Sequence, residues 1–180
     1  MPGAARGNRM QALLKAFWDI ALCRRSPADL PDSAALLLVA GAAYAAFSAL
    51  QSWLLFGPAG VVARTLADLV LLAAPLWLLL ALLRRLPRYR QTLSALLGAG
   101  AVLSPFLIAL VVLKEPAATS QPLALLVWAG SVAVIVWYLL VVGCVLRAAL
   151  ETGLFAGVAL ALAYVLGSAA VLTSLFPGTP

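Results

Sequence analysis

Asp68 is the one carboxylate inside a long apolar stretch of this 180-residue sequence, and Arg64 precedes it by four residues. On a helix, residues four positions apart lie on the same face, so these two opposite charges can pair. Charged residues are rare inside membrane spans and are by default candidates for function. Two interpretations follow: an intramembrane charge pair that is solvated at the outer interface, or a carboxylate that relays protons during transport.

Few other residues offer chemistry. The sequence has no histidine, which excludes His-dependent catalytic triads and HExxH zinc sites. Gly98-Ala99-Gly100 lies inside an apolar run with no strand before it, so it does not form a nucleotide-binding loop. Cys23 and Cys144 are too few for a disulfide framework, and we expect reduced thiols that serve as small apolar filler. The sequence thus predicts no enzyme activity, no metal site and no cofactor.

The composition decides the class of protein. With 65% hydrophobic and 10% charged residues and a mean hydropathy of +1.09, the chain has too few polar residues to cover a water-soluble globule. Inside lipid every backbone N–H and C=O needs an internal partner, and apolar runs of about 20 residues satisfy this need as helices. We predict an all-α fold, a polytopic membrane bundle of five transmembrane helices. The spans cover residues 33–56, 66–83, 92–113, 123–146 and 154–176, and they form one domain after an N-terminal segment, residues 1–32.

The basic residues set the expected orientation. Ten of the twelve fall on one side of the membrane, namely Arg6, Arg9, Lys15, Arg24, Arg25, Arg84, Arg85, Arg88, Arg90 and Arg147. By the positive-inside rule the N-terminus is then cytoplasmic, and five crossings place the C-terminus outside. The four arginines of the connection at residues 84–91 are expected to hold anionic lipid headgroups. Short loops beside membrane spans offer no basic stripe for nucleic acid, so we predict no nucleic-acid partner.

The N-terminal segment contains an amphipathic helix pattern. Its apolar residues recur at helical spacing, namely Met10, Leu13, Leu14, Phe17, Trp18, Ala21 and Leu22, and polar residues including Lys15 and Asp19 take the other face. Such a helix lies at the bilayer interface or packs as a cover over the ends of the bundle, and both placements stay open. Prolines between Ser26 and Ser33 stop the helix, and Asp32 or Ser33 caps the first span.

Small residues form stripes on two spans. Gly153, Gly157 and Ala161 follow one another at four-residue spacing in the last span, and Gly41 and Ala45 do so in the first. Small stripes let two helix backbones approach closely in lipid. The close contact forms either within the bundle or across a homodimer interface.

Prolines interrupt two other spans. Pro75 and Pro105 lie inside the second and third spans, where each removes a backbone hydrogen bond and bends the helix. Two bent neighbours can open a cavity for a substrate, although prolines in membrane helices commonly serve shape alone.

The overall layout adds a family resemblance. Five spans follow an N-terminal segment in which Phe17-Trp18 precedes Arg24-Arg25-Ser26-Pro27. In this layout the chain resembles the Yip family, five-span membrane proteins that interact in eukaryotes with Rab-type GTPases and have bacterial relatives. The Asp-Leu-Tyr-Gly-Pro signature of the eukaryotic members is absent, so the resemblance carries over no GTPase partner. Ten Arg against two Lys, with abundant Ala and Leu, are typical of a GC-rich bacterial genome and indicate a bacterial inner-membrane protein.

Two functions from different classes fit these observations. The first is a non-enzymatic inner-membrane protein that organises partners through its helix faces and its N-terminal helix. The second is a small transporter or channel, or a subunit of one, that uses the bent second and third spans and Asp68. The expected partners are the lipid bilayer, anionic lipid headgroups, and a membrane protein or a second copy of the chain.

Overall fold

A computed structural model describes residues 3–176, with side chains from residue 11 onward. Five helices are long and apolar enough to cross a membrane, so the predicted all-α membrane bundle of five spans is confirmed. The spans are α2 (Ala34–Phe56), α3 (Val61–Leu82), α4 (Tyr89–Val112), α6 (Gln121–Leu150) and α7 (Leu154–Leu175). The shorter elements are α1 (Gly3–Ala21), the 3-10 helices η1 (Pro27–Asp29) and η2 (Leu86–Arg88), and α5 (Lys114–Ala117). The predictions for the side chains of Arg6, Arg9 and Met10 fall outside the described residues.

Two spans, α3 and α6, differ most from their predicted limits. α3 begins at Val61 rather than at residue 66, because Gly57 and Gly60 adopt positive φ angles of 75° and 77° and turn the chain sharply. Glycine enters this left-handed region at no steric cost. α6 is 30 residues long and ends where Glu151 takes a left-handed φ of 53°. A bilayer core requires about 20 helical residues, so α6 extends into the headgroup region.

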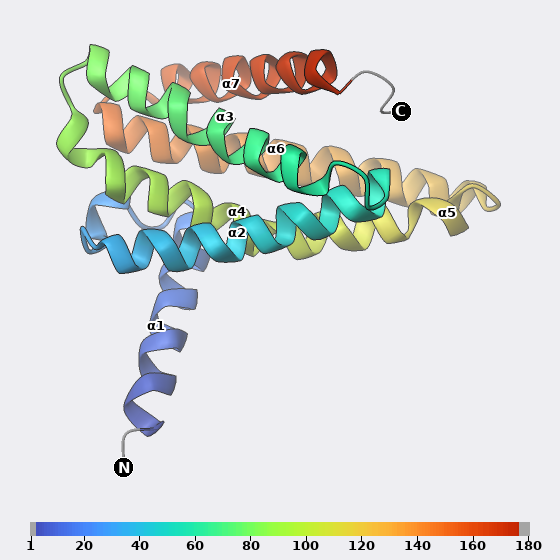
Figure 1. The fold of residues 1–180 in the computed structure, drawn as a ribbon, viewed down its shortest axis with the longest axis horizontal. Helices are drawn as coiled ribbons and strands as arrows, with labels where there is room; N and C mark the ends of the chain where they lie inside the picture. Colours follow the sequence, from blue (N-terminus) through green and yellow to red (C-terminus); the bar gives the residue numbers. More distant parts are fainter. Residues whose placement is uncertain (1–2, 177–180) are drawn as a thin grey trace.

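The spans lie side by side along the long axis of the molecule and run in alternating directions (Figure 1). We call the end that holds η1, η2 and residues 151–153 the arginine-rich end, and the end that holds residues 57–60 and α5 the opposite end. α2 packs against α4, α6 packs against α7, and α4 also packs against α6. α3 contacts α2, α4 and α7.

The core fills the arginine-rich half of the bundle. In α4 every residue from Thr92 to Ala101 is buried, because α1, η1, α2 and α6 all pack on this helix. In α6 most of the buried residues lie between Val141 and Leu150, the last ten positions of the helix. The halves of α4 and α6 toward the opposite end are less covered.

α1 runs across the spans instead of along them, and its first half extends beyond the side of the bundle (Figure 1). Its second half is anchored on α4 and α6, with Ala16, Phe17, Ile20 and Ala21 buried. The ring of Phe17 lies on Gly98 of α4, where an added Cβ atom would come within 2.2 Å of the ring. The anchored half of α1 is thus a cover on the bundle, one of the two placements that the sequence left open.

The buried face of α1 is rotated from the predicted one. Leu14 and Trp18 belong to the predicted apolar face but are 59% and 40% exposed, whereas Ala16 and Ile20 are buried. In a membrane protein an apolar side chain is equally stable against protein and against lipid tails. The apolar pattern therefore marks the helix and does not determine which of its sides meets the bundle.

Candidate functional site

The polar residues of α2 lie on one face of that helix. Tyr44, Ser48, Gln51 and Ser52 are spaced at i, i+4, i+7 and i+8, which is the spacing of one helical stripe. All four line cavities between the spans in the opposite half of the bundle. This stripe is missing from the predicted features, although its spacing is visible in the sequence.

Two adjoining cavities occupy this half, with volumes of about 350 and 290 Å³. Phe56, Arg64 and Phe176 line the first cavity, and they stand at the ends of α2, α3 and α7 that face the opposite end of the bundle. Tyr138 and Tyr164 line the second cavity, which lies deeper between the spans. The two cavities share the lining residues Ser48, Gln51, Asp68, Ala169 and Leu172. We call the combined space the polar cavity.

Asp68 is the acidic group of the polar cavity. The hydroxyl of Ser48 donates a hydrogen bond to Asp68 Oδ2 at 2.9 Å, and Tyr44 lines the same cavity. Hydrogen bonds from hydroxyls stabilise a carboxylate that is removed from bulk water. The carboxylate still faces the cavity, so it is held in place and remains open to a ligand.

Arg64 and Asp68 line the same cavity but do not form the predicted ion pair. Arg64 Nη1 donates instead to the carbonyl oxygen of Ala59 at 3.2 Å, and its guanidinium carbon lies 4.3 Å from the centroid of the Phe56 ring. This cation–π contact draws the arginine side chain toward Phe56, the last residue of α2. In the part of the chain that the structure describes, the ion pairs are those of Glu151 with Arg85 and Arg88.

The deep wall of the polar cavity is built from tyrosines. Tyr138 of α6 and Tyr164 of α7 line this wall, together with Ser168 one turn after Tyr164. Tyr44 lies on Gly100 of α4, where an added Cβ atom would come within 2.7 Å of its ring. The glycine allows the tyrosine to cross between α2 and α4, and this explains the presence of Gly100 in the apolar run without any nucleotide.

No family model, no curated protein and no solved structure matches the chain. The resemblance to the Yip family therefore stays a prediction. Any functional conclusion for this chain depends on the geometry of its own residues.

The arginine-rich end is joined by ion pairs. Arg85 Nη2 lies 2.9 Å from Glu151 Oε2, and Arg88 bonds the other oxygen of the same carboxylate. Hydrogen bonds from Arg88 and Arg85, together with their positive charge, lower the pKa of Glu151. Arg85 and Arg88 also donate to the carbonyl oxygen of Ala149. Two of the four arginines predicted to bind lipid headgroups thus bond protein groups, while Arg84 and Arg90 are exposed.

The small stripe of α7 packs against α6. A Cβ atom at Gly157 would come within 2.4 Å of the carbonyl oxygen of Gly143, and Ala161, one turn further, is fully buried. Gly153 caps α7 and has open space around it. The contact at Gly157 therefore lies within the bundle, and Gly143 is a partner that the sequence analysis did not identify.

The stripe of α2 makes a looser contact. A Cβ atom at Gly41 would lie 3.8 Å from Leu97 of α4, which is ordinary van der Waals distance. Ala45 is half-buried on the same helix. The stripe on α2 thus tolerates larger side chains more readily than the stripe on α7.

Neither proline is among the residues that line the polar cavity. Pro75 is inside α3 and lines an apolar groove of about 290 Å³. Pro105 is inside α4 and lines an apolar groove of about 610 Å³ beneath α1. Both bent spans nevertheless border the polar cavity, α3 with Arg64 and Asp68 and α4 with Gly100, Leu103, Ser104 and Leu107. That the bends themselves open the cavity stays a prediction.

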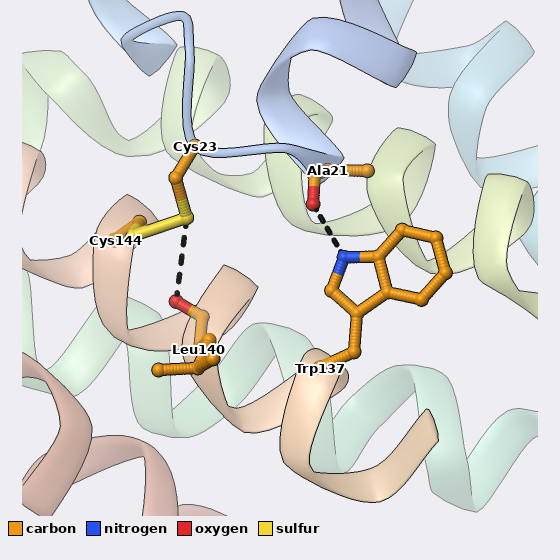
Figure 2. The surroundings of a disulfide bond; sticks show 5 residues. All are labelled: Ala21, Cys23, Trp137, Leu140 and Cys144. Atoms are coloured by element: carbon orange, nitrogen blue, oxygen red, sulfur yellow. Dashed lines mark hydrogen bonds between the residues drawn. A yellow bond between two sulfur atoms is a disulfide. The ribbon is translucent and has the colours of Figure 1, made fainter. Parts of the chain in front are cut away.

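The two cysteines form a disulfide (Figure 2), and the expectation of two separate thiols is wrong. Cys23 follows α1 and Cys144 lies in α6, with their Cα atoms 6.0 Å apart. Beside them the indole N–H of Trp137 donates to the carbonyl oxygen of Ala21 at 2.7 Å. A pairing across 121 residues of sequence is produced by the docking of α1, which the spacing of the cysteines does not reveal.

Proposed function

We propose that this protein is a small, non-enzymatic membrane transporter that takes a polar solute into the polar cavity and binds it at Asp68. One observation carries the proposal. The carboxylate of Asp68 lies within a membrane-spanning helix, lines a cavity, and accepts a hydrogen bond from the hydroxyl of Ser48. No cation pairs with it among the described residues.

Charge inside a membrane costs free energy. A carboxylate within a span is expensive and is retained where it faces the bundle interior or a cavity that holds water or substrate. A structural role would be better served by an apolar residue, because helices associate in lipid through close packing. The combined volume of the polar cavity lies in the range of small-molecule sites, about 300–1,000 Å³.

The shape of the bundle favours transport over simple binding. The polar cavity opens among residues at the opposite end, while the arginine-rich half is filled by the core. Leu80 of α3 and Val145 of α6 are almost fully buried there. A bundle that is hollow on one side and closed on the other corresponds to one state of an alternating-access carrier.

From the charge count we infer that the arginine-rich end faces the cytoplasm of a bacterial cell, and the polar cavity then opens outward. The disulfide favours the reverse orientation, with the arginine-rich end outside the cytoplasm, because disulfides form in oxidising compartments. We give more weight to the charge count, since it rests on twelve basic residues, whereas the disulfide is a single pair.

A second candidate is the organiser of membrane partners that the sequence favoured. It is supported by the half of α1 that extends beyond the bundle (Figure 1), where it is available to another protein or to the lipid surface. This candidate leaves the polar cavity and the placement of Asp68 without a role.

The proposal predicts that water reaches Ser48 from outside the cell. In a chain with Cys23→Ser and Cys144→Ser, Ser48→Cys should react with a membrane-impermeant maleimide added to intact cells. Leu50→Cys is the matched control, because Leu50 lies two residues away on the same helix, is 41% exposed and faces lipid, where thiolates do not form. Arg90→Cys at the arginine-rich end should react only after the cells are opened.

If Ser48→Cys does not react, in protein that melts like its parent, the cavity is not aqueous and the transporter proposal is refuted. Labelling of Arg90→Cys in intact cells would instead reverse the orientation.

A further inference from the structure

The polar cavity contains two opposite charges that do not neutralise each other. Arg64 and Asp68 are four residues apart on α3 and line one cavity of about 350 Å³. At this spacing their Cβ atoms are about 5–6 Å apart, so a direct ion pair is sterically accessible. The structure nevertheless bonds Arg64 to Ala59 and Asp68 to Ser48.

Arg64 retains unused hydrogen-bonding capacity. Its Nε atom is buried and has no hydrogen-bond partner among the described residues. A guanidinium has five N–H donors, and a buried donor without an acceptor costs free energy. The position beside the cavity therefore favours a ligand that brings an acceptor to this arginine.

We propose that the ligand of the polar cavity is a small zwitterion, with its anionic group on Arg64 and its ammonium group on Asp68. An anion alone would meet the carboxylate of Asp68 without a counter-charge, and a cation alone would do the same with Arg64. A zwitterion supplies both partners and leaves the site neutral, which keeps the cost of buried charge low. This inference rests on the proposed function, since it names the class of solute that the cavity takes.

Two sources offer this chemistry. A free solute such as an amino acid has an ammonium and a carboxylate, and the headgroup of an ethanolamine phospholipid has an ammonium and a phosphate. In both cases the arginine binds the oxyanion and the carboxylate binds the ammonium group.

The test compares three molecules of one chain length by isothermal titration on the purified wild-type protein in detergent. 4-Aminobutyrate has both charges, butylamine has only the ammonium and butyrate has only the carboxylate. We expect 4-aminobutyrate to bind about tenfold or more tightly than either analogue, because each analogue loses one charge-assisted contact. Equal affinities for butylamine and 4-aminobutyrate, or no binding of any of the three, would overturn the zwitterion.

Two variants assign the charges. Arg64→Gln should remove the preference for 4-aminobutyrate over butylamine, and Asp68→Asn should remove the preference over butyrate. If either variant fails to fold, the wild-type comparison still decides the question. The outcome is separable from the proposed function: labelling of Ser48→Cys with equal binding of butylamine refutes the zwitterion alone, whereas loss of that labelling refutes the aqueous cavity itself.

Lipid nanodiscs separate the two sources. If an ethanolamine lipid occupies the site, 4-aminobutyrate should bind more weakly in phosphatidylethanolamine than in phosphatidylglycerol. Equal binding in both lipids identifies a free solute. Either result supports the zwitterion, provided that the wild-type preference is present in phosphatidylglycerol.

Discussion

The two halves of this bundle treat charge in opposite ways. At the arginine-rich end, Glu151 is bonded by Arg85 and Arg88 together, and the same arginines bond the end of α6. In the opposite half, Arg64 and Asp68 share a cavity but bond different groups. Charges that satisfy one another stabilise the fold, whereas charges that remain separate are available for a ligand.

Packing shows the same contrast. In the arginine-rich half, Gly157 meets the backbone of α6 so closely that no side chain fits, and Phe17 occupies the space above Gly98. In the opposite half, polar side chains surround open volume. The arginine-rich half thus fixes the structure, and the opposite half keeps space for a solute. The following changes test this division.

The largest effect is expected for Gly157→Leu. The new side chain would overlap the carbonyl oxygen of Gly143, which is backbone and cannot rotate away, and overpacking of this kind costs about 3 kcal/mol or more. We expect α7 to separate from α6 and little folded protein to be recovered. Thermal unfolding and size-exclusion chromatography in one detergent measure this.

Gly167→Leu is the matched control for that change. It lies on the same helix, and a Cβ atom there would meet nothing within 4 Å, so its melting temperature should stay near the wild-type value. A Gly157→Leu protein that melts like Gly167→Leu would contradict the tight packing of the arginine-rich half.

A smaller effect is expected when the disulfide is removed. In purified, oxidised protein, Cys23→Ser should lower the free energy of unfolding by about 2–4 kcal/mol, because the cross-link restricts the unfolded chain. The loss should appear first as faster proteolysis near α1. Cys23→Ser with Cys144→Ser is the control, since it should match the single variant. Equal proteolysis of oxidised wild-type and variant protein would show that the other contacts of α1 suffice.

Glu151→Gln tests the charge network through pH. The folded-state pKa of Glu151 lies below the ordinary value of 4.5, so the carboxylate stabilises the fold above that value, and the contribution is lost as the pH falls through the folded-state pKa. Wild-type protein should therefore lose stability in acid more steeply than Glu151→Gln, when melting temperatures are compared between neutral pH and pH values below 4.5. Parallel pH profiles of the melting temperature for the two proteins would show that the charge of Glu151 does not stabilise the fold.

The smallest effect on stability is expected for Asp68→Asn. The amide still accepts a hydrogen bond from Ser48, so the free energy of unfolding should change by no more than about 1 kcal/mol. The preference for 4-aminobutyrate over butyrate should nevertheless be lost, because the amide has no charge to hold the ammonium group. Ser48→Ala serves as a comparison that keeps the carboxylate and should retain binding. A large loss of stability in Asp68→Asn would show that Asp68 has a structural role, and it would contradict the difference between the two halves.

The sequence predicted the architecture of the spans well and the site only in part. Apolar runs of membrane length need no tertiary information, because lipid forces each run to satisfy its own backbone hydrogen bonds. Asp68 and Arg64 were identified because charge inside such a run is conspicuous. The polar stripe from Tyr44 to Ser52 could have been found from its helical spacing, and the cysteine pair could not.

The sequence by itself determined that this chain is an all-α membrane protein of five spans, and it marked Asp68 as the residue to explain. The tertiary structure alone decided which partners each residue meets: Arg64 with Phe56 instead of Asp68, Glu151 with Arg85, and Cys23 with Cys144. The physical reason is that lipid constrains each helix separately. The contacts between helices depend on the shapes and charges of residues far apart in the chain, and these meet only when the bundle has formed.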